Sequence, residues 1–193
     1  GTRSGASCSS SGIEPRPLGT LHAMTSSSSI VFLTGASSGI GAATARLLVQ
    51  KGHRVFACAR RREKLEELAT SLPEPVRDSL AIRVLDVLDV EDHRKAVAEC
   101  VDRFGGLDVA VPNAGLGIFD NLGEAALEDW HTMVDVNVKG VLNTLHCCLP
   151  HLREAKGLVV NIGSVASRNV FPFSGVYCAV SYTHLTLPTT LVV

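Results

Sequence analysis

Short apolar runs alternate with stretches of helical periodicity from residue 30 onward. The run Ile-Val-Phe-Leu at 30–33 is continuous and apolar, which is typical of a strand buried on both faces of a parallel sheet. Four further strands are predicted, at 55–59, 81–86, 107–111 and 158–162. Apolar residues spaced three and four apart predict helices at 39–51, 63–71, 90–104 and 127–154, with a bend near Asn137 in the last.

Residues at the ends of these helices support the assignment. Gly52 follows the first helix as a C′ glycine, and Pro73 and Pro75 close off the second. Asp89 stands at the N-cap of the third helix, with Asp92 at the capping-box position. The alternation of buried strands and helices predicts right-handed βαβ units, and therefore an α/β fold with a doubly wound, Rossmann-type parallel sheet and helices on both faces.

Composition places the chain among ordinary globular proteins. Its 193 residues suit one domain, with 46% apolar and 19% charged residues. A net charge of −1 gives no reason to expect nucleic acid or an anionic membrane as a partner, and no apolar run reaches the roughly 18 residues that span a bilayer. The six cysteines lack a CxxC or metal-ligand spacing, so we expect free thiols, no metal site and a cytoplasmic protein.

The first 29 residues differ from the rest of the chain. They are rich in Ser, Gly and Pro, lack hydrophobic periodicity and do not begin with Met. Met24 stands just before the first strand as a plausible native start, so residues 1–29 are expected to be a disordered or non-native leader. A transit peptide is the alternative, because Arg3, Arg16 and the serines fit one loosely.

A glycine-rich turn at 34–41 (Thr-Gly-Ala-Ser-Ser-Gly-Ile-Gly) joins the first strand to the first helix. Gly35 permits a sharp exit from the strand, and Gly39 lets the backbone approach a pyrophosphate, whose charge the helix N-terminus stabilises. Gly41 lets the helix pack closely. Glycines in such a turn can serve geometry alone, but strand, turn and helix stand here in the order that a dinucleotide site requires. The turn residues Ser37, Ser38 and Ile40 are expected to share in that site.

The second strand is followed by three arginines rather than by an acid. An enzyme that prefers NAD usually has Asp or Glu here to bind the ribose 2′-hydroxyl, and this chain has no acid between the second strand and Glu63. Guanidinium groups suit the 2′-phosphate of NADP. We therefore expect NADP(H) in preference to NAD(H), with Arg60 as the first choice of ligand, Arg61 as the second, and Ser37 as a hydroxyl donor.

With these residues in place, the chain resembles the short-chain dehydrogenase/reductase family over about residues 30–179. The glycine turn matches the family's TGxxxGxG motif. The other matches, in chain order, are Asp86-Val87 after the third strand, Asn113-Ala114-Gly115 after the fourth, Asn137 in the long helix, Ser164 after the fifth strand, and Tyr177 thirteen residues later. Any one match is weak evidence, but the ordered set is strong.

The resemblance implies hydride transfer between NADP(H) and a small-molecule alcohol or carbonyl substrate. Tyr177 would be the general acid in reduction and the base in oxidation, and Ser164 would hydrogen-bond the carbonyl oxygen. Asn137 would hold a water of the proton relay, through its side chain or the local backbone. The remaining matches would line the cofactor site: Asp86, Val87, Asn113, Ala114 and Gly115. The resemblance also implies a homo-oligomeric parent protein.

Position 181 departs from the family pattern. The family has a lysine four residues after the tyrosine, which assists the phenol and holds the nicotinamide ribose, but this chain has Ser181. One interpretation is a regulatory protein that senses NADP(H) by binding it, without turnover. The other is that the chain leaves its native sequence here, because one coding sequence for 180–189 (Val-Ser-Tyr-Thr-His-Leu-Thr-Leu-Pro-Thr) resembles the adapter of transposase-based sequencing libraries.

Under the second interpretation, residues 180–193 are an artefactual tail and 30–179 an incomplete cofactor-binding domain. The tail lacks an amphipathic pattern, so the helix that should begin at Tyr177 is expected to be absent and the sheet to be truncated after the fifth strand. This chain would then be inactive, whereas the full-length parent would be an active oxidoreductase.

Overall fold

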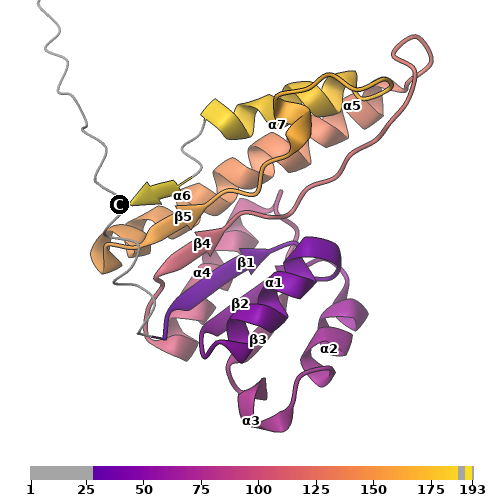
Figure 1. The fold of residues 1–193 in the computed structure, drawn as a ribbon. Coiled ribbons are helices and arrows are strands. Elements are labelled where there is room, and N and C mark those ends of the chain that lie inside the picture. The colour runs from indigo at the N-terminus through magenta and orange to yellow at the C-terminus, as the bar shows by residue number, and fades with distance from the viewer. Residues whose placement is uncertain (1–27, 187–189, 193) are drawn as a thin grey trace, which may run out of the picture.

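The computed structural model describes residues 28–186 and 190–192, and within them six strands form one sheet in the order β3-β2-β1-β4-β5-β6 (Figure 1). The first five strands pair in parallel, and β6 pairs antiparallel with β5. The strands are β1 (Ile30–Thr34), β2 (Arg54–Ala59), β3 (Leu80–Val84), β4 (Val109–Val111), β5 (Leu158–Val160) and β6 (Thr190–Val192).

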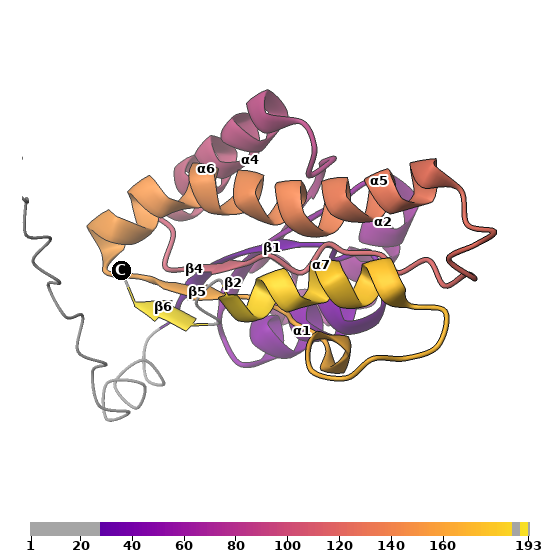
Figure 2. The ribbon, with the colours of Figure 1, turned by 90° about the horizontal axis from the view of Figure 1, so that it is seen from above.

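Helices cover both faces of this sheet, as Figure 2 shows from above. They are α1 (Gly39–Gln50), α2 (Arg62–Thr70), α3 (Glu74–Arg77), α4 (Val90–Phe104), α5 (Leu127–Val134), α6 (Gly140–Ala155) and α7 (Gly175–Thr186). A π-helical turn, η2 (Asp135–Lys139), joins α5 to α6 at the predicted bend, and a 3₁₀ turn, η3 (Val165–Ser167), follows β5. The predicted doubly wound parallel sheet is confirmed.

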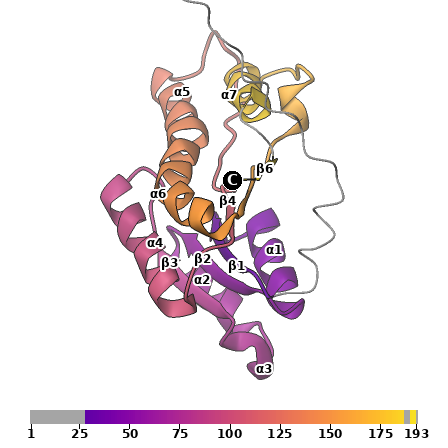
Figure 3. The ribbon, with the colours of Figure 1, turned by 90° about the vertical axis from the view of Figure 1, so that its left-hand side faces the viewer.

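The alternation of side chains along β1 explains the two layers. Ile30 and Phe32 belong to the core under α4 and α6, whereas Val31 and Leu33 belong to the core under α1 and α2. Successive side chains of a strand point to opposite faces, so a strand covered on both faces must be apolar throughout. Figure 3 shows α4, α5 and α6 on one side of the sheet and α1 on the other.

The predicted helix ends are confirmed in part. Gly52 follows the C-cap of α1 with φ 87°, and the Asp89 side chain accepts a hydrogen bond from Asp92 N at the start of α4. The carboxylate of Asp92 does not return to the cap. It binds the Arg83 guanidinium at 2.8 Å and so ties β3 to α4, and this hydrogen bond holds the pKa of Asp92 below its ordinary value.

Two prolines do more than the sequence suggested. Pro73 is the N-cap of the additional short helix α3, and Pro75 lies in its first turn. The fixed φ of proline suits the start of a helix, where the missing N–H costs nothing. Pro73 and Pro75 therefore begin an element as well as following α2.

The C-terminal expectation was wrong in two respects. Helix α7 continues through Tyr177 to Thr186, and β6 extends the sheet beyond β5. Val180 and Ser181 are buried, so packing stabilises this helix although its periodicity is weak. At the other end, Ser29 belongs to the folded part, because its carbonyl accepts from Arg54 N at 2.9 Å. Residues 1–27, with Met24, lie outside the described residues.

The described part of the chain has two further properties. None of its helices is long and apolar enough to cross a membrane. It also contains no group of three or more His, Cys, Asp or Glu residues placed to hold a metal ion. Burial raises the pKa of Cys58, Cys147 and Cys148, and raises that of Cys100 to about 12, so these thiols stay protonated at neutral pH.

Candidate active site

A cavity of about 550 Å³ opens beyond the carboxyl ends of the parallel strands, where the strand order reverses between β1 and β4. This is the position at which doubly wound sheets bind ligands. The predicted catalytic residues Asn137, Ser164 and Tyr177 line it. All predicted cofactor residues line it as well: Gly35, Ser37, Ser38, Gly39, Ile40, Gly41, Arg60, Arg61, Asp86, Val87, Asn113, Ala114 and Gly115.

The glycine turn has the shape that a dinucleotide needs. Gly35 has φ 69°, and a Cβ there would lie 2.8 Å from the Cα of Ala114, so only glycine fits. A Cβ on Gly41 would lie 2.6 Å from the Asn113 amide nitrogen. Gly39 has φ 53° but faces open space, which leaves room for a pyrophosphate at the N-terminus of α1.

Asn113 fixes this turn against the end of β4. Its side-chain nitrogen donates to the Thr34 carbonyl at 2.9 Å and to the Gly35 carbonyl at 3.3 Å. In return, the buried Thr34 hydroxyl oxygen accepts from the backbone nitrogens of Asn113 and Ala114, both at 3.1 Å. The turn and the strand end are therefore held together before any ligand binds.

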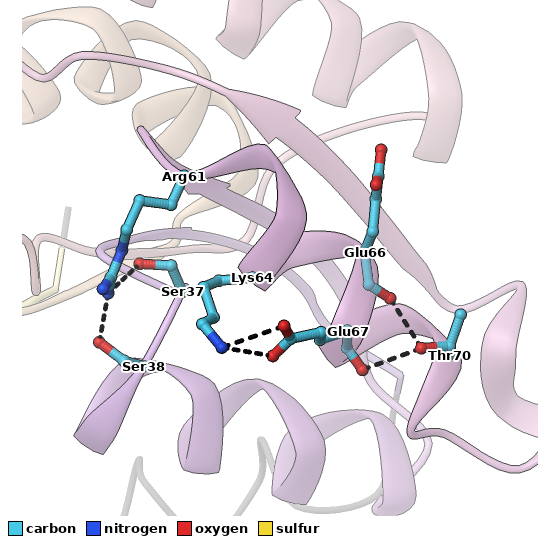
Figure 4. Close-up of polar contacts among 7 residues, drawn as sticks. All are labelled: Ser37, Ser38, Arg61, Lys64, Glu66, Glu67 and Thr70. Carbon is cyan, nitrogen blue, oxygen red and sulfur yellow. Dashed lines mark hydrogen bonds and ion pairs between the residues drawn. The ribbon is translucent and has the colours of Figure 1, made fainter.

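Arg61 reaches back from the start of α2 to the glycine turn (Figure 4). Its Nη2 donates to the hydroxyl oxygens of Ser37 at 2.9 Å and Ser38 at 2.7 Å. Arg60 lines the cavity and is exposed. The neighbouring Lys64 is paired with Glu67 at 2.7 Å instead of turning toward the cavity. The geometry thus gives Arg61 more support than Arg60, the reverse of the order expected from the sequence.

Asp86 and Val87 form the far wall of the cavity. The Asp86 carboxylate accepts from Leu88 N at 3.0 Å and is exposed, and the Val87 carbonyl accepts from the Asn143 side chain at 2.9 Å. Val87 packs against Gly140, the first residue of α6, where a Cβ would lie 2.6 Å from Val87 Cγ2. This wall is apolar with one exposed carboxylate.

The side chain of Asn137 is held at both of its polar atoms. It is buried in the π-helical turn, where its Oδ1 accepts from Leu116 N at 3.0 Å and its Nδ2 donates to Leu116 O at 2.7 Å. These bonds position the loop that follows Gly115. The Asn137 carbonyl accepts from His184 Nε2 at 2.8 Å. The sequence left two routes to a water open, the side chain and the local backbone, and in the structure the side chain and the Asn137 carbonyl each have a protein partner.

Ser164 and Tyr177 reach the cavity from the two sides of the loop after β5. Ser164 caps the 3₁₀ turn, with its Oγ accepting from Ala166 N at 3.1 Å. Tyr177 lies in the first turn of α7 and packs edge-on against Phe119, with ring centroids 5.4 Å apart. Two other residues of α7 line the cavity, Ser181, which stands where the family has its lysine, and His184, which sequence reasoning missed because no helix was expected there.

Comparison with known proteins identifies the class. The short chain dehydrogenase family matches residues 29–181, and the chain therefore belongs to this family of oxidoreductases. Serine 3-dehydrogenase of Agrobacterium fabrum is 41% identical over 149 residues, which are 77% of this chain and 57% of the relative. Sulfoacetaldehyde reductase 2 of Chromohalobacter salexigens is 41% identical over 155 residues, 79% of this chain and 61% of the relative. The chain thus spans about three fifths of the length of these curated relatives.

Solved structures agree with this assignment. An alcohol dehydrogenase from Thermococcus sibiricus complexed with 5-hydroxy-NADP has a TM-score of 0.78 and 34% identity, over 83% of this chain and 68% of that one. Carveol dehydrogenase from Mycobacterium avium in complex with NAD has a TM-score of 0.77 and 28% identity, over 84% and 64%. The Rossmann-type nucleotide-binding fold is shared, and the neighbours include complexes with either cofactor.

Proposed function

We propose that the full-length parent of this chain is an NADP(H)-dependent oxidoreductase that interconverts a small-molecule alcohol and its carbonyl compound. The observation that carries the proposal is that the glycine turn, Ser164 and Tyr177 line a single cavity. A bound NADPH would supply the hydride that the carbonyl carbon takes up, with NADP⁺ as its oxidised product. The residues of this chain must then bind the oxygen and deliver one proton.

Tyr177 and Ser164 are the residues proposed for that task. The Tyr177 hydroxyl donates its proton to the carbonyl oxygen as the carbon is reduced, so that one hydride and one proton together form the alcohol. The Ser164 hydroxyl hydrogen-bonds the same oxygen and orients it. Asn137 acts as a positioning residue, because its side chain holds Leu116 and its carbonyl faces α7.

The preference for NADP(H) rests on the arginines. A 2′-phosphate placed beside the Ser37 and Ser38 hydroxyls would lie against the Arg61 guanidinium, and the Arg60 side chain lines the same cavity. We expect Arg61→Ala to weaken NADPH binding about tenfold to a hundredfold, because hydrogen bonds to charged groups contribute about 1.5–3 kcal/mol. NADH lacks the 2′-phosphate, so its affinity should stay the same.

Fluorescence titration of both cofactors measures this difference. Arg62→Ala is the matched control, because Arg62 is exposed and lies 3.9 Å from Glu66 on the outer surface of α2. Equal losses of NADPH affinity in the Arg61 and Arg62 variants, or a loss of NADH affinity as large as that of NADPH, would contradict the proposed phosphate site.

A second candidate function is a non-catalytic NADP(H)-binding regulatory protein, which Ser181 favours. Ser181 lines the cavity and is buried, and its hydroxyl carries no charge to assist Tyr177. We therefore propose that this chain is inactive. A panel of aldehydes and ketones, assayed for NADPH oxidation with the parent protein completed from its native gene and, where it has serine at 181, with its Ser181→Lys variant, separates the two functions. Tight NADPH binding without turnover by the lysine variant would favour the regulator.

The parent protein is proposed to be a cytoplasmic homo-oligomer, with residues 30–179 as its incomplete cofactor domain and 180–193 as a non-native tail. The family match ends at residue 181, two residues inside the proposed tail, which supports a change of sequence near this position. Recovery of the source DNA tests it, because an uninterrupted genomic reading frame for 181–193 would contradict a non-native tail.

A further inference from the structure

Phe119 lies beside Tyr177 and is 63% exposed. The two rings meet edge to face, with centroids 5.4 Å apart and planes at 65°. Gly117 makes this arrangement possible, because a Cβ there would lie 3.0 Å from Phe119 Cζ and 3.2 Å from Tyr177 Cδ2. An aromatic ring held against the proposed acid with much of its surface in water is placed to contact whatever reacts there.

The charges of the cavity lie at its other end. Its charged lining residues Arg60, Arg61 and Asp86 follow β2 and β3. The described lining around Tyr177 is neutral, namely Leu116, Gly117, Ile162, Gly163 and Ser164. Nearby, His184 is hydrogen-bonded to the Asn137 carbonyl. An anionic group on the substrate would therefore lose water beside Tyr177 without gaining a lysine or arginine partner in this part of the lining, which is unfavourable.

Further apolar side chains continue the Phe119 surface on the two loops that flank Tyr177. Leu122 is 55% exposed and packs on Gly175, the first residue of α7. Phe173 is 64% exposed, and its carbonyl accepts from Asp120 N at 2.9 Å, which joins the two loops. The apolar side chains beside the proposed acid are thus held by contacts between two loops, and the exposed Asp120 and Asn121 lie between Phe119 and Leu122.

We propose that Phe119 is a specificity-determining residue, whose ring selects uncharged aldehydes and ketones, or the matching alcohols, that carry a planar apolar group. The apolar group packs on the exposed face of Phe119 while the oxygen lies between Tyr177 and Ser164. This inference deepens the proposed function and rests on it for the identity of the reacting oxygen.

The experiment measures binding to the whole chain, so it does not depend on turnover. NADP⁺ is titrated first, and two probes, acetophenone and pyruvate, are then titrated into the NADP⁺ complex by saturation-transfer NMR. We expect acetophenone to bind more tightly than pyruvate, and Phe119→Ala to weaken acetophenone about threefold to tenfold by loss of the aromatic contact. Phe119→Tyr keeps the ring and should restore the affinity. Phe171→Ala is the matched control, because Phe171 is 44% exposed on the loop before α7 and should leave both probes unaffected.

Each outcome decides one of the two claims. Equal acetophenone affinity in wild type and Phe119→Ala overturns the role of Phe119, as does an equal loss in Phe171→Ala. Pyruvate binding at least as tightly as acetophenone, or no binding of acetophenone, overturns the substrate class. Failure of NADP⁺ to bind overturns the proposed function instead. If acetophenone then still binds and its affinity still depends on Phe119, the aromatic binding site is supported without the proposed function.

Discussion

Lowering the pH from 7 to 5 should destabilise the folded chain through His93. This side chain of α4 is fully buried, and neither ring nitrogen has a hydrogen-bond partner among the described residues. Its ring lies 5.8 Å from that of Phe32 of β1. Burial lowers the pKa of His93 from 6.5 to about 4, and Arg83 adds to this, although Asp92 and Asp89 oppose it.

The sign and size of the effect follow from linkage. Above pH 6.5 the imidazole is neutral in both states and contributes no pH dependence. Between pH 6.5 and about 4 the His93 imidazole is protonated in the unfolded chain but neutral in the folded chain, so the free energy of unfolding falls as the pH falls. From these two pKa values, the free energy of unfolding is lower by about 2 kcal/mol at pH 5 and by about 3 kcal/mol once the pH is below both of them.

Urea unfolding at pH 7 and pH 5, followed by the fluorescence of the single tryptophan, Trp130, measures this loss. The matched variant is His93→Leu, which keeps an apolar side chain in the same core and should be at least as stable as wild type at pH 7, since two unpaired nitrogens are removed. Its free energy of unfolding should fall by about 2 kcal/mol less than that of wild type between the two pH values. Parallel pH profiles for the two proteins would refute the reasoning.

Four other substitutions test the site and its supports. Gly35→Ala should lower the free energy of unfolding and the NADPH affinity more than Gly39→Ala, because a Cβ at 35 meets backbone at 2.8 Å and a Cβ at 39 meets nothing within 4 Å. The Gly39 variant then bears only the cost of a left-handed backbone, about 1–2 kcal/mol. Thermal melts and cofactor titration compare the two variants, and equal effects would contradict the packing argument. Asn137→Ala should lower the free energy of unfolding in urea by about 2–5 kcal/mol, because it leaves the N–H and the carbonyl of Leu116 without their side-chain partner. A decrease below about 1 kcal/mol would show that water replaces the amide. Asp89→Ala should cost about 1 kcal/mol through the lost cap of α4, and unchanged stability would mean that the cap contributes nothing.

Much of the site could be predicted because its residues follow strands. The ends of parallel strands meet at one edge of a sheet, so the residues after β1, β2, β3 and β4 converge whatever lies between them. The contact of Arg61 with the Ser37 and Ser38 hydroxyls could not be predicted in this way, since it depends on where a long side chain reaches in space. The occupied side chain of Asn137 was equally beyond reach, because its partner Leu116 lies 21 residues away.

The amino-acid sequence by itself determined the doubly wound sheet, since strands buried on both faces must be apolar throughout and the intervening helices carry one apolar stripe. It also determined the cofactor turn, where glycines are required by backbone geometry that no other residue adopts cheaply. Only the tertiary structure decided that α7 forms, because packing rather than periodicity stabilises it. Only the structure, too, brought Phe119 to Tyr177, since contacts between loops depend on side-chain packing in space and leave no periodic pattern along the chain.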